Sequence, residues 1–430
     1  RFRLRGLAKK TYRLRAARAG VGWEKIWTLP GQAIAVGTLD AKLVLAAEGK
    51  LSGKVLFADG SAPAAFSVGV DFAPPQPFSA ASGAFALDEV HEGKHRLTVF
   101  GPSFIQKAAD DIEVTASATK DVGTITVEKG RSVSGRVLRQ DGSTVAGAKV
   151  LAGAKLISMG SELGSSLLAG RMGAKETTSG DDGTFVLAGV GEKALLLGAD
   201  HAEGRSALTP IGVGTTSVVV DVVLLAAGSL EGKITQQGKP IQAMVMATPQ
   251  AARRGNFLVS AGADGTYRFD KLAADVYLVS ALLQIGVTGG AFQTARAVVE
   301  SGKTARLDID IPKGGVTVTV RVTVGAASAQ NAVVFFGTGT FIAKTSDDLE
   351  NAMNEGSTRQ AMVVKGEPVV LEDVTPGTYT ACGIVISDDL SDPAAMQRLA
   401  DAENLPVACQ PVHVGDAKSL EVVIALPKSS

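Results

Sequence analysis

The sequence predicts an all-β protein made of antiparallel β-sandwich domains in tandem, and two observations predict it. First, a strand-like motif recurs along the chain at intervals of 83, 100, 82 and 102 residues. These intervals have the length of whole domains and not of solenoid turns. Second, 50 glycines accompany an ordinary apolar fraction of 45%. That composition is typical of many short strands joined by glycine-containing turns.

The motif is a short alternating strand, led by an aromatic residue in four of its five copies and followed by a turn and a second strand. The copies begin at Phe2, Phe85, Phe185, Tyr267 and Val369. The second strand contains, in the same order, Tyr12, His95, Leu195, Tyr277 and Tyr379. We therefore expect His95 to be a strand residue at a position that three other copies fill with tyrosine.

The motif divides the chain into five segments, each a β-sandwich domain or part of one. The expected segments are 1–47, the C-terminal half of a sandwich; 48–129; 130–227, with an insertion at 156–173; 228–314; and 315–430, with an insertion at 341–357 and a short helix at 391–400. Because the first copy lies where the middle of a domain belongs, we expect the chain to continue a longer protein. A missing signal peptide then says nothing about export.

In the first segment, apolar Phe2, Leu4 and Leu7 alternate with arginines, which predicts a strand with one apolar and one basic face. A second strand is expected around Tyr12. The 47 residues hold ten Lys or Arg against two acids. Such a basic stripe near Trp23 fits either a polyanion site or the solvated faces of edge strands, which also block aggregation.

The complete segments open with similar strands, of which Leu51–Phe57 is an example, followed by turn residues. The motif strand is preceded by the turn pairs Asp182-Gly183 and Asp264-Gly265 in two copies. These pairs tolerate the positive φ values of tight hairpin turns. The linkers between segments are only a few residues long, which predicts restricted hinge motion and an elongated, semi-rigid array.

The last segment holds both cysteines of the chain, Cys382 and Cys409. Each lies in or beside an expected strand, and the helix expected at 391–400 lies between them. We expect them to form a disulfide, stabilising by roughly 3 kcal/mol through the unfolded state; the alternative is two reduced buried thiols. A disulfide would place the protein in an oxidising compartment.

Candidate binding residues come from the tryptophans and from an acidic insertion. They are Trp23, Trp27, Asp347, Asp348 and Glu350. Long insertions in compact domains are often functional. Formal net charge is zero, so bulk electrostatics predict no binding to nucleic acid, and no apolar run is long enough to span a bilayer.

One motif suggests an enzyme and is set aside. His91 and His95 flank Glu92 with the spacing of a zinc-protease helix. The segment is expected at a turn between two strands and contains Gly93, a poor helix former. Calcium at Asp181-Asp182 or Asp347-Asp348 lacks the spacing of a calcium loop. We therefore expect no catalytic residue, no metal and no cofactor.

The best-matching stretches, Asp182–Val190 and Leu371–Tyr379, together with the opening strands, resemble the carboxypeptidase regulatory-like domain. This resemblance implies a seven-stranded, prealbumin-like (or immunoglobulin-like) sandwich. It also implies an accessory module of exported proteins without catalytic residues of its own.

These observations together favour a non-enzymatic extracellular or cell-surface protein, a stalk, fibre or adhesin shaft that associates with itself or with another surface protein. Two alternatives stay open. One is a module that binds polysaccharide or a surface partner, and the other is the accessory region of a larger secreted enzyme.

Overall fold

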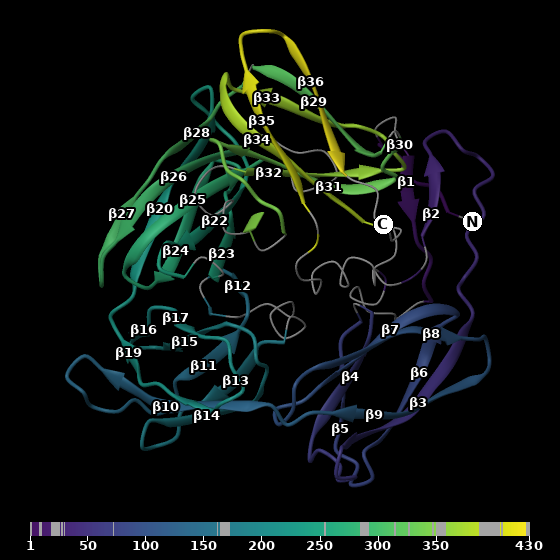
Figure 1. Ribbon diagram of the computed structural model, residues 1–430, viewed down its shortest axis with the longest axis vertical. Coiled ribbons are helices and arrows are strands. Elements are labelled where there is room, and N and C mark those ends of the chain that lie inside the picture. Colours follow the sequence, from purple (N-terminus) through teal and green to yellow (C-terminus); the bar gives the residue numbers. More distant parts are fainter. Residues whose placement is uncertain are drawn as a thin grey trace. The chain divides into compact units, whose positions relative to one another are not determined.

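A computed structural model of the chain consists of β-strands, numbered β1 to β36 (Figure 1). The structure describes residues 2–7, 11–18, 26, 29, 31–71, 73–160, 162–163, 173–252, 255–283, 292–313, 315–325, 327–345, 348–349, 358–386, 405 and 407–426. Contacts divide the chain into two compact units: residues 1–131 with 188–191, and residues 132–187 with 192–430. Among the described residues, no helix has the length and apolar character needed to cross a bilayer.

The first unit begins with a two-stranded antiparallel sheet of β1 (Thr11–Leu14) and β2 (Gln32–Ala35). The strand expected over Phe2–Leu7 is wrong: these residues form none, and Phe2 and Leu4 are more than half exposed. The later motif strands each pair with the opening strand of their own domain, and the described residues include no opening strand for the first copy. An isolated alternating segment does not form a strand without a partner.

The rest of the first unit is a sandwich of seven strands, which we call the first module. Its strands are β3 (Glu48–Phe57), β4 (Phe66–Val70), β5 (Gln76–Phe78), β6 (Ala84–His91), β7 (Gly93–Phe100), β8 (Lys107–Val114) and β9 (Thr119–Val127). One sheet has the order β6-β3-β9 and the other β5-β4-β7-β8. Apolar residues from both sheets, such as Leu51, Phe85 and Leu97, form a single core.

Three further sets of strands, which we call the second, third and fourth modules, lie in the second unit, except for residue 131 of β10 and residues 188–190 of β14, which group with the first unit. The second has β10 (Arg131–Arg139), β11 (Lys149–Gly153), β12 (Leu156–Met159), β13 (Lys175–Thr178), β14 (Thr184–Val190), β15 (Leu195–His201), β16 (Gly204–Arg205), β17 (Thr209–Ile211), β18 (Val218–Val219) and β19 (Val222–Leu224). The third has β20 (Gly228–Gln236), β21 (Lys239–Pro240), β22 (Met244–Pro249), β23 (Gly255–Ser260), β24 (Thr266–Leu272), β25 (Asp275–Leu282), β26 (Phe292–Val299), β27 (Thr304–Arg306) and β28 (Ile309–Ile311). The fourth has β29 (Val316–Val324), β30 (Ala327–Ser328), β31 (Asn331–Thr338), β32 (Thr358–Val364), β33 (Val369–Val374), β34 (Gly377–Val385), β35 (Ala408–Val414) and β36 (Ser419–Leu426).

All four modules share one sheet topology. The opening strand pairs with the motif strand on one side and, in parallel, with the closing strand or strands on the other: β6-β3-β9, β14-β10-β18 with β19, β24-β20-β27 with β28, and β33-β29-β36. The fold class expected from the sequence, tandem β-sandwiches, is therefore confirmed. The last four copies of the motif occupy equivalent positions.

The motif strand has this position because its alternation puts one face into the core. Phe85 and Leu87 are 4% and 3% exposed, and Ala86 between them is exposed. The turn before it in the second module has the expected chemistry. Asp182 accepts a hydrogen bond from the Thr184 N–H at 3.0 Å, and Gly183 has a φ of 75°.

Candidate functional site

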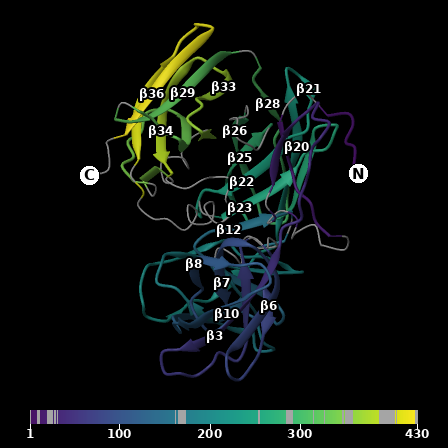
Figure 2. The ribbon, with the colours of Figure 1, turned by 90° about the vertical axis from the view of Figure 1, so that its right-hand side faces the viewer.

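A joint couples the second and third modules within the second unit. The strand β12 leaves the sheets of the second module and adds to the sheet β23-β22-β25-β26 of the third. It pairs in parallel with β23, Leu156 opposite Gly255 and Met159 opposite Leu258. The two strands lie side by side in Figures 1 and 2. The insertion expected at 156–173 therefore begins with a strand that belongs to the next module.

The apolar part of the joint is continuous with the core of the third module. Leu156 is 1% exposed and belongs to one buried cluster with residues of both modules, Leu196 and Phe257 among them. A side chain at Gly255 would put its Cβ 2.2 Å from the Leu208 side chain. Glycine at this position lets the two modules approach closely.

The polar part of the joint is a buried group of charges. The Arg205 side chain is fully buried and donates to the Asp200 carboxylate at 2.8 Å. Lys271, from the third module, lies 2.5 Å from the other Asp200 oxygen and donates to the carbonyl of His201 at 2.7 Å. Arg205 also donates to the Lys271 carbonyl. These bonds therefore cross the joint in both directions.

The charges of this joint are matched. Burial raises the pKa of the Asp200 carboxyl, but the Arg205 charge and hydrogen bonds from Arg205, Lys271 and the Leu163 N–H outweigh it and hold the pKa below its ordinary value. The Arg205 guanidinium also lies 5.3 Å from the centre of the Phe257 ring, in the range of a cation–π contact. A buried ion group with this many partners avoids the cost of an isolated buried charge.

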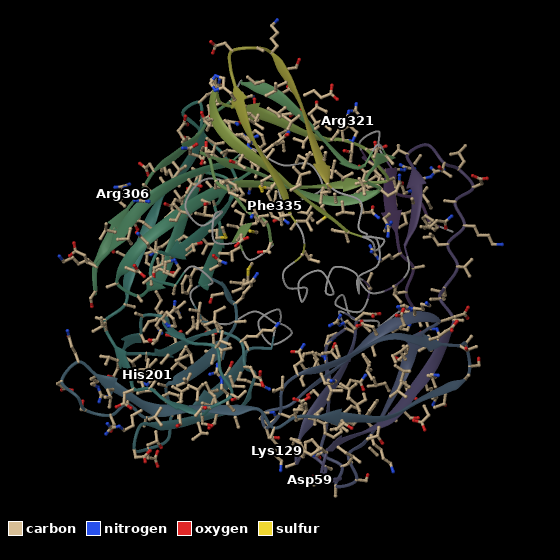
Figure 3. The ribbon with its side chains drawn as sticks, in the orientation of Figure 1. Asp59, Lys129, His201, Arg306, Arg321 and Phe335 are labelled. Atoms are coloured by element: carbon tan, nitrogen blue, oxygen red, sulfur yellow. A yellow bond between two sulfur atoms is a disulfide. The ribbon has the colours of Figure 1, made fainter. Side chains whose placement is uncertain are left out.

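The disulfide expected in the last segment is present. Cys382 on β34 and Cys409 on β35 are bonded, with their Cα atoms 4.1 Å apart, as a directly opposed cross-strand pair. Phe335, labelled in Figure 3, lies opposite Cys382 on β31 and packs in a small apolar cluster with both cysteines.

The other sequence-predicted binding residues are not brought together by the described part of the chain. Trp23, Trp27, Asp347 and Glu350, and the helix expected at 391–400, lie outside the described residues. Asp348 is described, and its carboxylate accepts hydrogen bonds from the N–H groups of Lys344 and Thr345, both at 3.1 Å. These hydrogen bonds lower the pKa of Asp348, and the one from Lys344 has the largest effect. Asp348 therefore closes a local turn.

The turn that connects the motif strand to the first strand of the opposite sheet carries a hydrogen bond that we call the corner hydrogen bond. The Tyr277 hydroxyl donates to the carbonyl of Ala273 at 3.0 Å, and the Tyr379 hydroxyl donates to that of Thr375 at 2.8 Å. In each case the acceptor is four residues earlier in the chain. The second module has Leu195 at this position, 8% exposed, and fills it with apolar contact alone.

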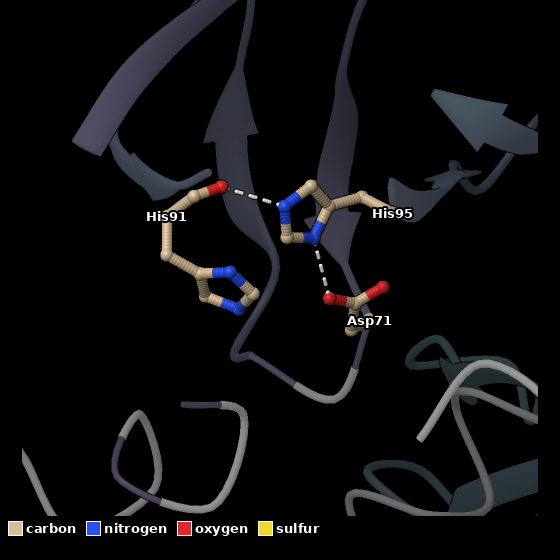
Figure 4. A group of neighbouring side chains, drawn as sticks. All are labelled: Asp71, His91 and His95. Carbon is tan, nitrogen blue, oxygen red and sulfur yellow. Dashed lines mark hydrogen bonds and ion pairs between the residues drawn. The ribbon is translucent and has the colours of Figure 1, made fainter. Parts of the chain in front are cut away.

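The first module makes the same bond with histidine. His95 is 1% exposed, and its Nε2 lies 2.7 Å from the carbonyl of His91, again four residues earlier. Residues 91–95 thus span the turn between β6 and β7, which lie in different sheets, as expected for a turn between two strands, and do not form a helix. Its other nitrogen, Nδ1, lies 2.7 Å from a carboxylate oxygen of Asp71 (Figure 4).

Asp71 and His91 also line a pocket of about 90 Å³ in the first unit. The wall carries charges of both signs among its apolar residues: Arg18 lies 3.2 Å from Glu48, and Asp88 and Glu89 add two further carboxylates. Sequence reasoning missed Asp71, because it lies 20 residues or more from both histidines in the chain. Only the pairing of β4 with β7 brings them together.

Comparisons with known proteins find similarity among solved structures only. No protein-family model matches the chain, and no curated protein matches it. The carboxypeptidase regulatory-like assignment therefore stays a prediction.

Similar solved structures include a streptococcal ancillary pilin, with 13% identity, 62% of this chain and 99% of that chain covered, and a TM-score of 0.20. A minor pilin of Streptococcus agalactiae has 13% identity over 43% of this chain and 96% of that chain, with a TM-score of 0.23. The TIE protein of Bacillus anthracis has 10% identity over 92% of this chain and 76% of that chain, with a TM-score of 0.20. Similarity at these TM-scores establishes nothing further about this chain.

Proposed function

We propose that this chain is a non-enzymatic structural protein of the cell surface or extracellular space, a stalk, fibre or adhesin shaft. Its partners would be further copies of itself or another surface protein. The single observation that carries the proposal is the joint between the second and third modules, in which a strand of one module completes a sheet of the next.

The joint supports a mechanical role because bending it has a large cost. Separating the modules would unpair β12 from β23 and expose Leu156 to water. It would also withdraw Lys271 from Asp200 and leave the Asp200 and Arg205 charges less well compensated. Two modules held in this way transmit tension and orientation along the chain.

The short connections and the disulfide support the same role. The strands β9 and β10 are separated by residues 128–130, β19 and β20 by residues 225–227, and β28 and β29 by residues 312–315. The disulfide Cys382–Cys409 is a bond typical of oxidising compartments such as the cell exterior.

Single-molecule force spectroscopy of the full chain tests the mechanical premise. We expect the second and third modules to unfold as one event, which releases residues 131–311 and so roughly 600 Å of extended chain. Ile157→Pro removes an N–H from β12 and should split this event into two of roughly 300 Å. Glu176→Pro, on the edge strand β13 of the second module's own sheet, is the matched control and should leave one event. Two events in the unaltered chain would contradict the proposal.

Labelling of intact cells of the native host with an antibody against this chain tests the location. Surface labelling along fibres or stalks supports the proposal, and labelling confined to permeabilised cells rejects it. Binding of the purified chain to a polysaccharide array, abolished by Trp27→Ala, would instead favour the polysaccharide-binding alternative.

A further inference from the structure

At its corner the first module has an imidazole that faces a carboxylate, where the third and fourth modules have a tyrosine hydroxyl. The corner hydrogen bond needs only one polar atom, which Tyr277 and Tyr379 supply with a hydroxyl. His95 supplies it with Nε2 and has a second nitrogen, Nδ1, on the opposite side of its ring. The corner hydrogen bond therefore does not account for the contact between Nδ1 and the Asp71 carboxylate.

The hydrogen bonds of His95 determine which of its nitrogens carries a lone pair. A backbone carbonyl only accepts, so Nε2 carries the proton that bonds to the carbonyl of His91 at 2.7 Å. In a neutral imidazole the lone pair is then on Nδ1, directed at the Asp71 carboxylate oxygen 2.7 Å away. Two electron-pair donors at this distance need a cation between them, either a proton or a metal ion.

The carboxylate of Asp71 is held in place for this role. Its second oxygen, Oδ1, accepts the Arg96 N–H at 2.9 Å, which directs Oδ2 at His95. The side chains of His95 and Asp71 are 0% and 8% exposed. Little water therefore competes for the position between them.

A second imidazole completes the set. The ring of His91 lies 4.3 Å from that of His95, centre to centre, and ligand atoms of Asp71, His91 and His95 all lie within 4.8 Å of one another (Figure 4). Ligand atoms on a tetrahedral zinc ion are about 3.3 Å apart, given bond lengths near 2.0 Å. To reach that spacing, the longer separations must close by up to about 1.5 Å (from 4.8 to about 3.3 Å), through movement of the partly exposed His91 ring, and the 2.7 Å distance between His95 and Asp71 must open by about 0.6 Å.

We propose that Asp71, His91 and His95 bind a divalent transition metal of the zinc class in the first module. Two imidazoles and one carboxylate are ligands that zinc accepts, whereas calcium and magnesium prefer oxygen alone. The carbonyl of His91 orients the His95 ring through its other nitrogen, as carbonyls do behind metal-binding histidines.

The pocket beside the cluster favours a cation and leaves room for a fourth ligand. Asp71 and His91 face it, and its wall includes Glu48, Asp88 and Glu89 against one arginine. A volume of about 90 Å³ holds several water molecules. Glu92 is exposed and outside the cluster, so the structure provides a binding site and not the arrangement of a zinc protease.

Titration of the full chain with zinc tests the proposal, after its metals have been removed with a chelator and by dialysis. Isothermal titration calorimetry should show one zinc ion per chain, and cobalt at the same site should give the visible absorption of a four-coordinate ion. His91→Ala removes one ligand and should weaken binding by at least about 10- to 100-fold, the range known for loss of an outer partner. The control is His413→Ala, which replaces an exposed histidine of β35 and should bind zinc as the unaltered chain does.

His95→Tyr separates the fold from the site. Tyrosine can make the corner hydrogen bond as Tyr277 and Tyr379 do, but it brings no imidazole. We expect this variant to keep the circular dichroism spectrum of the unaltered chain and to lose the zinc ion. Absence of one-to-one binding by the unaltered chain overturns the proposal, as does unchanged affinity in His91→Ala, whether or not His95→Tyr folds.

Discussion

The strands β7 and β34 occupy the same position in the first and fourth modules, yet different bonds tie them to the strand beside them. Both begin just before a residue that makes the corner hydrogen bond. Three residues farther on, β34 carries Cys382, which is covalently bonded to Cys409 on β35. The corresponding pair on β7 and β8 is Thr98 opposite Ala108.

The third module shows an intermediate case. On β25 and β26 the same pair is Ser280 opposite Thr294, and their hydroxyls are hydrogen-bonded at 3.0 Å. The sheet register thus creates a position that accepts a disulfide, a hydroxyl pair or a plain contact. The backbone topology is common to the modules, whereas the chemistry at this position and at the corner is specific to each.

The largest effect is expected on β15, the equivalent strand of the second module, where Asp200 takes part in the buried joint. Asp200→Ala leaves the Arg205 guanidinium buried without its carboxylate and should cost about 3–5 kcal/mol. Amide hydrogen exchange should show faster opening of both β15 and β25. Asp221→Ala, which breaks an exposed pair with Arg136, should cost less than about 1 kcal/mol. Similar losses in the two variants would show that the joint is not coupled through Asp200.

Removal of the disulfide should have the next largest effect. Cys382→Ser with Cys409→Thr gives the fourth module the hydroxyl pair of the third. A bond that spans 27 residues stabilises by about 3 kcal/mol through the unfolded state, so the variant should unfold at correspondingly lower urea concentration. Under reducing conditions the variant and the unaltered chain should unfold at the same concentration. A difference that persists there would point to side-chain packing instead.

The reverse exchange should stabilise the third module. Ser280→Cys with Thr294→Cys puts a disulfide where two hydroxyls are already 3.0 Å apart. The loop is about half as long as that in the fourth module, so we expect a gain of about 1–3 kcal/mol under oxidising conditions. Denaturant unfolding with and without reductant measures it. Failure of the bond to form would show that the two positions differ in backbone geometry.

A smaller effect is expected at the corners. Tyr379→Phe removes the hydroxyl that bonds the Thr375 carbonyl and should cost about 1 kcal/mol, as should Tyr277→Phe at Ala273. Denaturant unfolding of the full chain, monitored by amide hydrogen exchange in β34 and β25, measures both losses of stability. An unchanged free energy of unfolding would mean that the hydroxyl contributes no stability. An apolar side chain at this position, such as Leu195 in the second module, would then stabilise the corner as well as tyrosine does.

The smallest effect expected is a pH dependence of the joint. Because the pKa of Asp200 is below its ordinary value in the folded chain, the carboxylate contributes stability at pH values above its unfolded pKa, about 4. That contribution should be lost as the pH falls through the lower, folded pKa. Exchange of β15 should therefore not change between about pH 7 and pH 5 after correction for intrinsic rates, and should increase below about pH 4. Asp200→Ala should show no such increase.

Much of the fold could be predicted because its signals are local. The alternation of Phe85 and Leu87 and the positive φ available at Gly183 depend on neighbouring residues alone, and both predictions are confirmed. The same kind of reasoning was wrong for Phe2–Leu7, since a strand also needs a partner to pair with. Local pattern tells which face a strand buries but not what it pairs with.

The sequence by itself determined the sandwich class, the equivalence of His95 with the tyrosines of the other corners, and the position of the cysteines. Only the tertiary structure decided that β12 joins the next module, that Lys271 reaches Asp200, and that Asp71 faces the histidines. These contacts join residues that are distant in the chain and of ordinary type. Sheet register and the packing of modules bring them together, and neither leaves a repeating pattern in the sequence.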